Sequence, residues 1–169
     1  GIPVFKADES GRKVLESDTD VVSAVTKLIG DGAYDKGGKA NRAFIASQVF
    51  NDDVKLNALN HIIHPAVGRD FQQWKLRQNH PLCIREAAIL FESGTHQDCD
   101  QIICVSANEQ IRIARVIIRD GVEEVAVRAR MAKQWSQDKK ENLSDFIIYN
   151  NGHEGLISQV ISVVNQIMQ

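Results

Sequence analysis

Two carboxylates follow short apolar runs, at places where a parallel α/β sheet would hold reactive groups. Asp8 comes three residues after the run at residues 1–5, behind Lys6 and Ala7, and Glu92 comes directly after the run at residues 87–91. In open α/β sheets the reacting groups lie in the crevice beyond the carboxyl ends of the strands. A carboxylate there can accept a proton from a substrate hydroxyl or help to organise a metal ion. The alternatives are structural: Asp8 can be a helix N-cap, and Glu92 can be a solvated loop acid.

A row of arginines supplies the second kind of chemistry. Its members are spaced i, i+3 and i+7, which places them on one helix face: Arg112, Arg115 and Arg119. A further basic stretch follows, with Arg128, Arg130 and Lys133. Guanidinium groups match the geometry of phosphate oxygens, so a phosphate-bearing ligand is one interpretation of the row. The alternative is a solvated basic face that Asp120 and the acidic pair at 123–124 partly neutralise.

Two histidines could mimic part of a metal site. His61 and His64 are spaced i, i+3 and stand just before Pro65. No cysteine or carboxylate is arranged to complete a ligand set of the usual kind. We therefore predict no metal ligand here and a hydrogen-bonding role for His64 at a helix end.

Composition limits the class of protein. The 169 residues make a chain of one domain, with 43% hydrophobic and 25% charged residues, as in ordinary globular proteins. The formal net charge of -2 gives no electrostatic case for a nucleic-acid or membrane partner. The three cysteines lack CxxC spacing and are interpreted as packing thiols in a reducing compartment: Cys83, Cys99 and Cys104. The sequence therefore predicts a cytoplasmic protein.

Strands and helices alternate along the chain, which predicts a parallel sheet covered by helices. After the first strand, apolar residues recur at helical spacing behind Asp18, which can cap that helix. Residues 40–79 are helical in pattern almost throughout. His64 and Pro65 interrupt them, and the proline is expected in the first turn of a new helix. A second strand begins at residues 82–84.

The C-terminal half continues the alternation. Residues 101–105 predict a third strand, and Ser106 with Glu109 matches a capping box whose helix ends at Gly121. A strongly basic helix is predicted over 122–135. A fourth strand follows at 146–148, and a last amphipathic helix closes the chain.

The order of the motifs resembles that of the dephospho-CoA kinase family, over essentially the whole chain. The motifs that carry the resemblance are GIPVF-x-AD from Gly1, L-x-x-IIHP from Leu59, EAAILFE from Glu86, R-x-x-x-RD from Arg115, R-x-x-x-Q from Arg130 and DFII-x-N-x-G from Asp145. Each motif is weak alone, whereas the set with its spacing is specific.

This resemblance implies a P-loop kinase fold, an α/β parallel sheet flanked by helices. It implies one kinase domain with a core at 1–30, 82–106 and 145–169, a helical CoA-binding insertion at about 31–80 and a helical lid at about 107–144. The implied reaction transfers the γ-phosphate of ATP to the ribose 3′-hydroxyl of dephospho-CoA, with Mg²⁺, as the last step of coenzyme A synthesis. A monomer or small homo-oligomer is expected.

The resemblance also implies roles for single residues. The catalytic positions are the carboxylate that handles the hydroxyl and two lid arginines: Asp8, Arg115 and Arg119. The substrate-binding positions match the CoA-binding insertion and the acid that closes the acceptor site: Arg42, His64, Pro65 and Glu92. The loop beside the adenine matches Asn150 and Gly152. Phosphoryl transfer depends mainly on positioning and charge neutralisation, which such a set can supply.

Two departures from the family pattern stand out. Lys6 occupies a position where the family commonly has a second aspartate. No GxxxxGK[ST] loop occurs, and Gly37-Gly38-Lys39 lacks the spacing and the preceding strand of one. We therefore expect roughly 25 further residues before Gly1, the length that a strand, a phosphate loop and a helix require, and little activity without them. The alternatives are a related nucleoside or nucleotide kinase and a non-catalytic paralogue that binds a CoA-like ligand.

Overall fold

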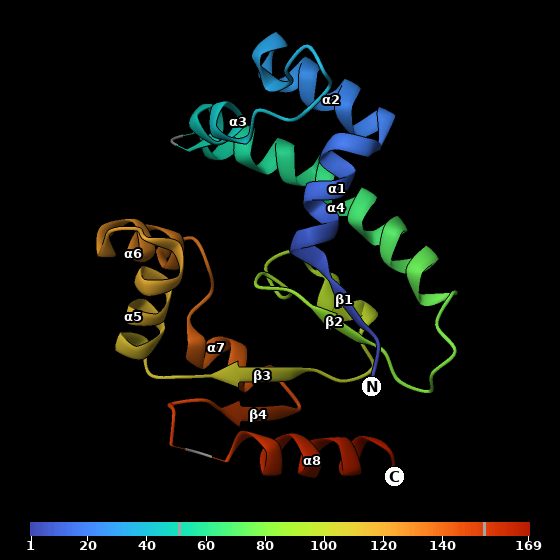
Figure 1. The fold of residues 1–169 in the computed structure, drawn as a ribbon, viewed down its shortest axis with the longest axis vertical. Helices are drawn as coiled ribbons and strands as arrows, with labels where there is room; N and C mark the ends of the chain where they lie inside the picture. The colour runs from blue at the N-terminus through green and yellow to red at the C-terminus, as the bar shows by residue number, and fades with distance from the viewer. Residues whose placement is uncertain (51, 154) are drawn as a thin grey trace. The chain divides into compact units, whose positions relative to one another are not determined.

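The computed structural model describes residues 1–50, 52–153 and 155–169, which form two compact units. The first unit is Gly1–Ala88 and the second is Ile89–Gln169. Both combine parallel strands with helices (Figure 1). Within the described residues, every helix is too short or too polar to cross a bilayer.

The first unit starts with a parallel pair of strands. β1 (Val4–Lys6) pairs with β2 (Ile84–Glu86), and Phe5 of β1 is buried in the core. Helices occupy most of the chain between the two strands, as the alternating pattern predicted: α1 (Ala7–Ser17), α2 (Thr19–Ile29), the short 3-10 helix η1 (Asp31–Ala33), α3 (Arg42–Val49) and α4 (Asp53–Lys75). α1 follows β1 without a loop, so the strand end and the helix start coincide.

Pro65 lies inside α4, and the prediction of a helix break at His64 and Pro65 was wrong. A proline in a helix interior costs about 3 kcal/mol, because it lacks an N–H and its ring crowds the preceding turn. Each apolar side chain that is fully buried contributes about 1.5–3 kcal/mol in return. Pro65 is exposed, while α4 buries residues on both sides of it: Leu59, Ala66, Val67 and Phe71. This packing outweighs the cost of the proline.

Asp18 caps α2, as its position before the apolar repeat predicted. One carboxylate oxygen accepts hydrogen bonds from the backbone N–H groups of Asp20 and Val21, each at 3.1 Å. The other oxygen accepts one from Arg69 of α4 at 3.1 Å. The bond from Val21 is the main reason that the pKa of Asp18 lies below its ordinary value. Asp18 thus joins the start of α2 to α4.

Replacing Asp18 with alanine is expected to lower the free energy of unfolding by about 1 kcal/mol at pH 7, because the cap is lost. The pKa of Asp18 is lowered in the folded protein. Its contribution is therefore present above the unfolded pKa of about 3.9 and declines as the pH falls through the folded value. Urea unfolding at pH 7 and pH 3 measures both effects. Asp20→Ala, which leaves the cap in place, is the control, and an equal loss in both variants would contradict the assignment.

The second unit contains the other parallel pair. β3 (Ile103–Ser106) pairs with β4 (Phe146–Tyr149), so that Ser106 lies opposite Tyr149. α8 (Leu156–Ile167) packs on β4. The predicted third and fourth strands and the last helix are thereby confirmed, with small shifts of their ends.

The remaining helices of this unit differ from the predictions in detail. They are the 3-10 helix η2 (Thr95–Asp98), α5 (Glu109–Asp120), α6 (Glu124–Ala132) and α7 (Gln137–Asn142). α5 ends at Gly121, whose φ of 64° is left-handed, as predicted. The predicted capping box was wrong, because Asn108 caps α5 and Ser106 belongs to β3. The basic helix expected over 122–135 is also shorter, and the polar helix α7 was not foreseen.

Candidate functional site

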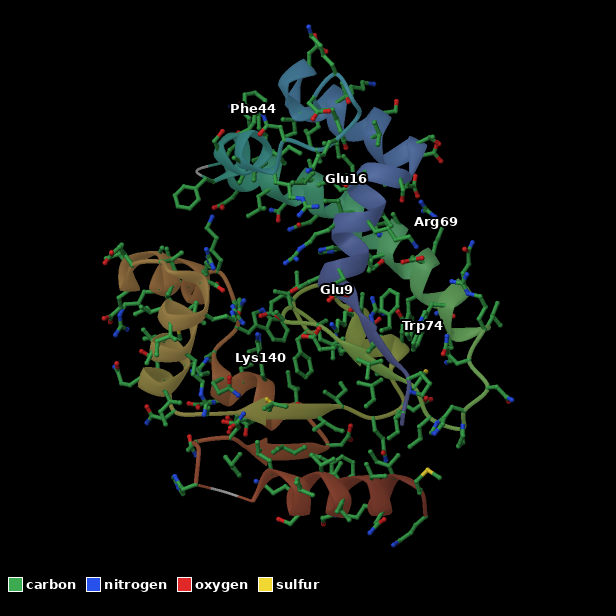
Figure 2. All side chains as sticks on the ribbon, in the orientation of Figure 1. Glu9, Glu16, Phe44, Arg69, Trp74 and Lys140 are labelled. Atoms are coloured by element: carbon green, nitrogen blue, oxygen red, sulfur yellow. The ribbon has the colours of Figure 1, made fainter. Side chains whose placement is uncertain are left out.

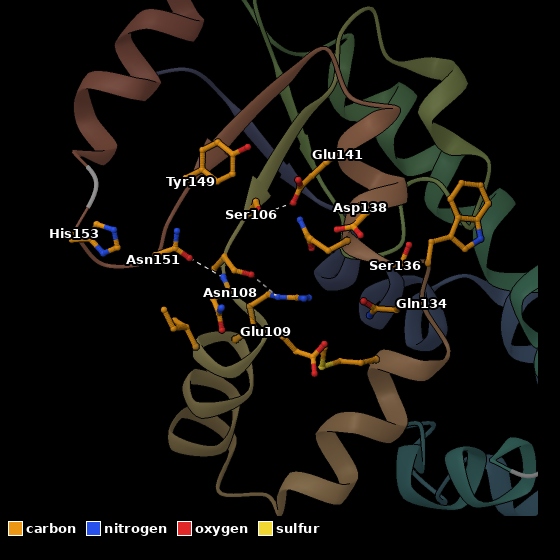
Figure 3. Close-up of a pocket in the computed structure, with 16 residues that line it drawn as sticks. Ser106, Asn108, Glu109, Gln134, Ser136, Asp138, Glu141, Tyr149, Asn151 and His153 are labelled. Atoms are coloured by element: carbon orange, nitrogen blue, oxygen red, sulfur yellow. Dashed lines mark hydrogen bonds between the residues drawn. The ribbon is translucent and has the colours of Figure 1, made fainter.

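A pocket of about 930 Å³ opens in the second unit. Three segments line it: the end of β3 with the start of α5, the end of α6 through α7, and the end of β4 with the loop after it (Figure 3). The carboxyl ends of both parallel strands thus lie at the pocket. This is where α/β sheets place their ligands.

Hydrogen bonds between the lining segments fix the pocket walls. The backbone N–H of Asn108 donates to Asn151 Oδ1 at 2.8 Å, which joins the start of α5 to the loop after β4 (Figure 3). Ser106 Oγ donates to Glu141 at 2.6 Å, which joins β3 to α7. The exposed phenol ring of Tyr149 also borders the pocket. Amide and aromatic groups of this kind suit a flat, polar ligand such as a nucleobase.

Three residues of the predicted site meet beside this pocket. Arg115 donates from Nη1 to the backbone carbonyl of Asn150 at 2.8 Å and from Nη2 to its Oδ1 at 3.3 Å. Gly152 follows two residues later with a φ of 105°, a conformation that favours glycine. A Cβ atom at this position would lie 3.9 Å from Arg115 Nη2. The structure therefore brings Arg115, Asn150 and Gly152 together.

Arg119 shares a carboxylate with a second arginine. Its guanidinium binds both oxygens of Asp120, at 2.7 and 3.1 Å, and Arg130 reaches the same carboxylate at 3.3 Å. The hydrogen bond from Arg119 is the main reason that the pKa of Asp120 lies below its ordinary value. The expectation that Asp120 partly neutralises the arginine row is confirmed. Arg119 remains exposed, so an incoming anion can reach it.

Asp8 lies in the first unit, in the first turn of α1 directly after β1. Its interpretation as a helix N-cap was wrong, because the N-cap position is Lys6. Lys6 instead forms an ion pair with Glu9 at 2.8 Å. Among the described residues, no hydrogen bond or ion pair engages the exposed Asp8 carboxylate, which leaves both of its oxygens able to accept.

α1 is held firmly behind Asp8. Ser10 Oγ donates to Asp70 of α4 at 2.7 Å, and Lys13 pairs with the same carboxylate at 3.2 Å. Phe5 of β1 packs edge-on against Phe71 and beside Trp74, both of α4. Figure 2 shows Glu9 and Trp74 at this end of the unit. The backbone that carries Asp8 is therefore fixed by both α1 and β1.

The expected CoA-binding residues also belong to the first unit. Arg42 begins α3 and pairs with Glu16 of α1 at 3.0 Å, with half of its side chain exposed. His64 lies in the middle of α4, not at a helix end as predicted. Burial, together with the charges of His61 and Arg85, lowers the pKa of His64, which favours its neutral form. Pro65 next to it is exposed.

Metal-binding side chains do not converge in the described part of the chain. No group of three or more His, Cys, Asp or Glu residues there could hold a metal ion. His61 Nδ1 lies 2.7 Å from the carbonyl oxygen of Asn57 on its own helix. His61 thus makes a local contact on α4.

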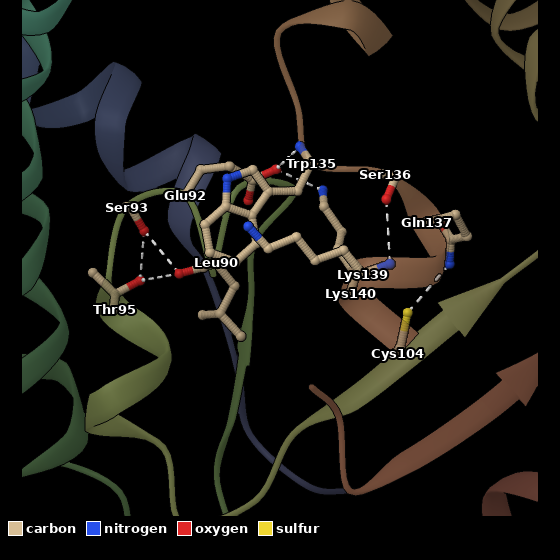
Figure 4. A network of polar contacts seen from close by, with 10 residues as sticks. All are labelled: Leu90, Glu92, Ser93, Thr95, Cys104, Trp135, Ser136, Gln137, Lys139 and Lys140. Carbon is tan, nitrogen blue, oxygen red and sulfur yellow. Dashed lines mark hydrogen bonds and ion pairs between the residues drawn. The ribbon is translucent and has the colours of Figure 1, made fainter. Parts of the chain in front are cut away.

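Glu92 has partners that the sequence did not reveal. Its Oε1 accepts hydrogen bonds from the backbone N–H of Trp135 at 2.8 Å and from Lys140 Nζ at 2.9 Å (Figure 4). Burial alone would raise the pKa of Glu92, but the bonds from Lys140 and Trp135 outweigh it and lower the pKa. Glu92 is therefore a largely buried ionised carboxylate, not a solvated loop acid. No local signal could have identified Trp135 and Lys140, since both are more than 40 positions away.

Comparison with known proteins gives one consistent family. The sequence pattern of the family described as dephospho-CoA kinase matches residues 1–155. Dephospho-CoA kinase of Chlorobium chlorochromatii is 36% identical over 178 aligned positions, covering 100% of this chain and 84% of the relative. The enzyme of the same name from Bacteroides fragilis is 32% identical over 97% of this chain and 80% of the relative.

Solved structures agree with this result. A crystal structure from Thermus thermophilus superposes with a TM-score of 0.88 at 25% identity, covering 100% of this chain and 86% of the other. Dephospho-CoA kinase from Campylobacter jejuni gives a TM-score of 0.69 at 22% identity, covering 99% and 85%, and supports the fold. The expected α/β fold class of parallel strands flanked by helices is confirmed.

Proposed function

This chain belongs to the dephospho-CoA kinase family, and from that premise we propose how its residues divide the work of phosphoryl transfer. The reaction of the family uses ATP and dephospho-CoA and is the last step of coenzyme A biosynthesis. Such a transfer needs a positioned acceptor hydroxyl, an in-line γ-phosphate and positive charge around the transferring group.

Asp8 is the residue proposed to handle the acceptor hydroxyl. Its free carboxylate at the end of β1, on a helix held by the Ser10–Asp70 bond, is the single observation that carries the assignment. As the 3′-oxygen bonds to the γ-phosphorus and the bond to the ADP oxygen breaks, Asp8 accepts the proton of the hydroxyl. A fixed backbone keeps this carboxylate in one place during the step.

Arg115 and Arg119 are proposed to neutralise the charge on the transferring phosphoryl group. Both lie on α5, whose first residues line the pocket of the second unit. The adenosine part of ATP is proposed to occupy that pocket beside Asn150 and Gly152. Arg115 already contacts Asn150, so nucleotide binding and the placement of this arginine are linked through one residue.

The CoA-binding role remains a proposal for Arg42, His64 and Pro65. Arg42 carries an exposed guanidinium that suits a phosphate of dephospho-CoA. The lowered pKa of His64 favours a neutral ring at physiological pH, which supports a hydrogen-bonding role without charge. Glu92 is also expected at the acceptor site, but its Oε1 is engaged by Trp135 and Lys140. Within the described residues only its buried Oε2, which has no hydrogen-bond partner there, is left for such a contact.

Three further features complete the proposal. Mg²⁺ is proposed to enter with the ATP phosphates, since the described side chains offer no converging ligand set of their own. A cytoplasmic location is proposed, and it is supported by the reduced state of the three cysteines, none of which forms a disulfide. A monomer or small homo-oligomer is proposed, and light scattering coupled to size-exclusion chromatography measures it.

The activity is tested by offering the intact protein several acceptors with MgATP. We expect the protein to form CoA from dephospho-CoA. The kcat/KM for dephospho-CoA should be at least about 100-fold above that for nucleosides or nucleoside monophosphates, because the acceptor site recognises the CoA moiety. Chromatography of the products distinguishes CoA from ADP formed by hydrolysis. Equal turnover of a nucleoside monophosphate would point to a related nucleotide kinase. Binding of dephospho-CoA without turnover, followed by calorimetry, would point to a non-catalytic paralogue.

A further inference from the structure

The turn that follows β2 makes hydrogen bonds to α7 and to the segment that joins α6 to α7. This turn, residues 89–94, carries Glu92, whose Oε1 accepts from the backbone N–H of Trp135 and from Lys140 Nζ (Figure 4). The side chains of both Glu92 and Lys140 are only 14% exposed. A charged pair that water hardly reaches is screened little, so it holds its geometry better than a surface pair.

Aromatic packing reinforces the same contact. The ring of Trp135 stacks on Phe91, with centroids 6.0 Å apart and an interplanar angle of 13°. Lys139 Nζ lies 3.3 Å from the centre of the Trp135 ring in a cation–π contact. Phe91 is buried, so the indole is fixed against the unit's interior. Three contacts therefore hold Trp135: the hydrogen bond from its backbone N–H, the stacking on Phe91 and the cation–π contact with Lys139.

α7 is fixed as well, on the other side of Trp135. Ser106 Oγ of β3 donates to Glu141, and Gln137 Nε2 approaches Cys104 Sγ of β3 at 3.3 Å. Ser136 caps the helix by accepting from the backbone N–H of Lys139. The segment 133–136 is therefore the joint between α7, which is bound to the sheet, and α6.

α5 and α6 form an arm that is attached to the rest of the unit at both of its ends, in addition to the hydrogen bonds from Arg115 to Asn150. The first is Asn108, whose backbone N–H donates to Asn151. The second is Trp135, whose backbone N–H donates to Glu92. Arg115 and Arg119 lie on this α5–α6 arm. The second attachment therefore helps to set where both arginines stand.

From this geometry we infer that Glu92 is a positioning residue: with Lys140 it anchors the Trp135 joint and so places the α5–α6 arm that carries Arg115 and Arg119. The inference rests on the proposed role of these two arginines. In this inference Glu92 positions the arm instead of closing the acceptor site. Lys140 and Trp135 contribute to the same anchoring contact.

The test compares Glu92→Gln with Lys140→Gln in the intact protein. Both variants remove the charged pair, while the amide oxygen introduced by Glu92→Gln can still accept the Trp135 N–H. We expect each to lower kcat about tenfold while the KM for dephospho-CoA stays within about twofold, because arginine placement matters most in the transition state. A matched control is Glu124→Gln, which removes the exposed pair with Arg128 on α6 and should change neither value.

Trp135 itself provides a second measurement that needs no substrate. In a Trp74→Phe background Trp135 is the remaining tryptophan of the sequence. Acrylamide quenching of its fluorescence should rise about twofold in both anchor variants and stay unchanged in Glu124→Gln, since a released indole is more accessible. This measurement tests the anchor even if the proposed activity fails.

Three results would overturn the inference. A rise in the KM for dephospho-CoA on Glu92→Gln, with kcat retained, would return Glu92 to the acceptor site. A normal kcat in Lys140→Gln beside a low one in Glu92→Gln would show that Glu92 acts without its partner. Unchanged quenching of Trp135 in both variants would show that the joint does not depend on the pair.

Discussion

Asp8→Asn is expected to lower the turnover number by about 100-fold or more while the KM for ATP changes by less than about twofold. Asparagine keeps the size of the side chain but cannot accept the proton of the 3′-hydroxyl. Because Asp8 is exposed and lies in the first turn of α1, its loss should reduce the free energy of unfolding by less than about 1 kcal/mol. Initial rates of CoA formation at varied ATP and dephospho-CoA measure the effect.

Glu9→Gln is the matched control for Asp8. Glu9 stands in the same turn of α1 and is exposed, but its carboxylate is engaged by Lys6. We expect a rate close to that of the unmodified protein. An Asp8→Asn rate within about threefold of the unmodified enzyme would remove Asp8 from the mechanism, since a general base normally contributes more than that.

Arg119→Ala is expected to lower kcat by about 1,000-fold, the lower end of what a charge-stabilising arginine contributes to phosphoryl transfer. Lysine at the same position should restore part of the rate, because it keeps the charge but not the planar fork. The fold should tolerate the change, since Asp120 keeps Arg130 as a partner. Single-turnover rates with saturating ATP report the transfer step directly.

The control for Arg119 is another exposed arginine of the same arm. Arg128 on α6 pairs with Glu109 at 3.0 Å and with Glu124 at 2.7 Å. Arg128→Ala should leave kcat within about twofold and change stability little, because exposed ion pairs contribute little. An equal loss of kcat in Arg119→Ala and Arg128→Ala would mean that the rate depends on the total positive charge of the arm. A normal rate in Arg119→Ala would mean that Arg119 is a surface charge that takes no part in the transfer.

Local patterns predicted the elements whose causes are local. Asp18 caps α2 because its side chain reaches N–H groups two and three residues ahead. Gly121 ends α5 because a left-handed residue costs least as glycine. The apolar run at residues 101–105 predicted β3, although Ile103 and Val105 of that strand are exposed. In each case the deciding contact, or the residue type itself, lies within a few positions.

The errors came from contacts that are distant in the sequence. Ser106 matched a capping box, but its hydroxyl donates to Glu141, 35 positions away, and Asn108 takes the cap. Pro65 was expected to start a helix, yet the core packing of α4 carries the helix through it. α7 is six polar residues without an apolar stripe, so no periodicity predicted it. Of the site, the motifs named Arg115, Asn150 and Glu92 as single residues, whereas the contact between Arg115 and Asn150 and the partners of Glu92 could not be predicted from local patterns.

The two attachments of the α5–α6 arm have a geometric consequence for how it can move. A rigid body held at two points can only rotate about the line through them, and a third contact away from that line removes this rotation. Asn108 and Trp135 supply two such points, and the hydrogen bonds from Arg115 to Asn150 supply the third. Arg119 lies about 6 Å farther along α5 from Asn108 than Arg115 does, at about 1.5 Å per residue. Breaking the contact between Arg115 and Asn150 would therefore leave the arm one rotation, in which Arg119 moves farther than Arg115.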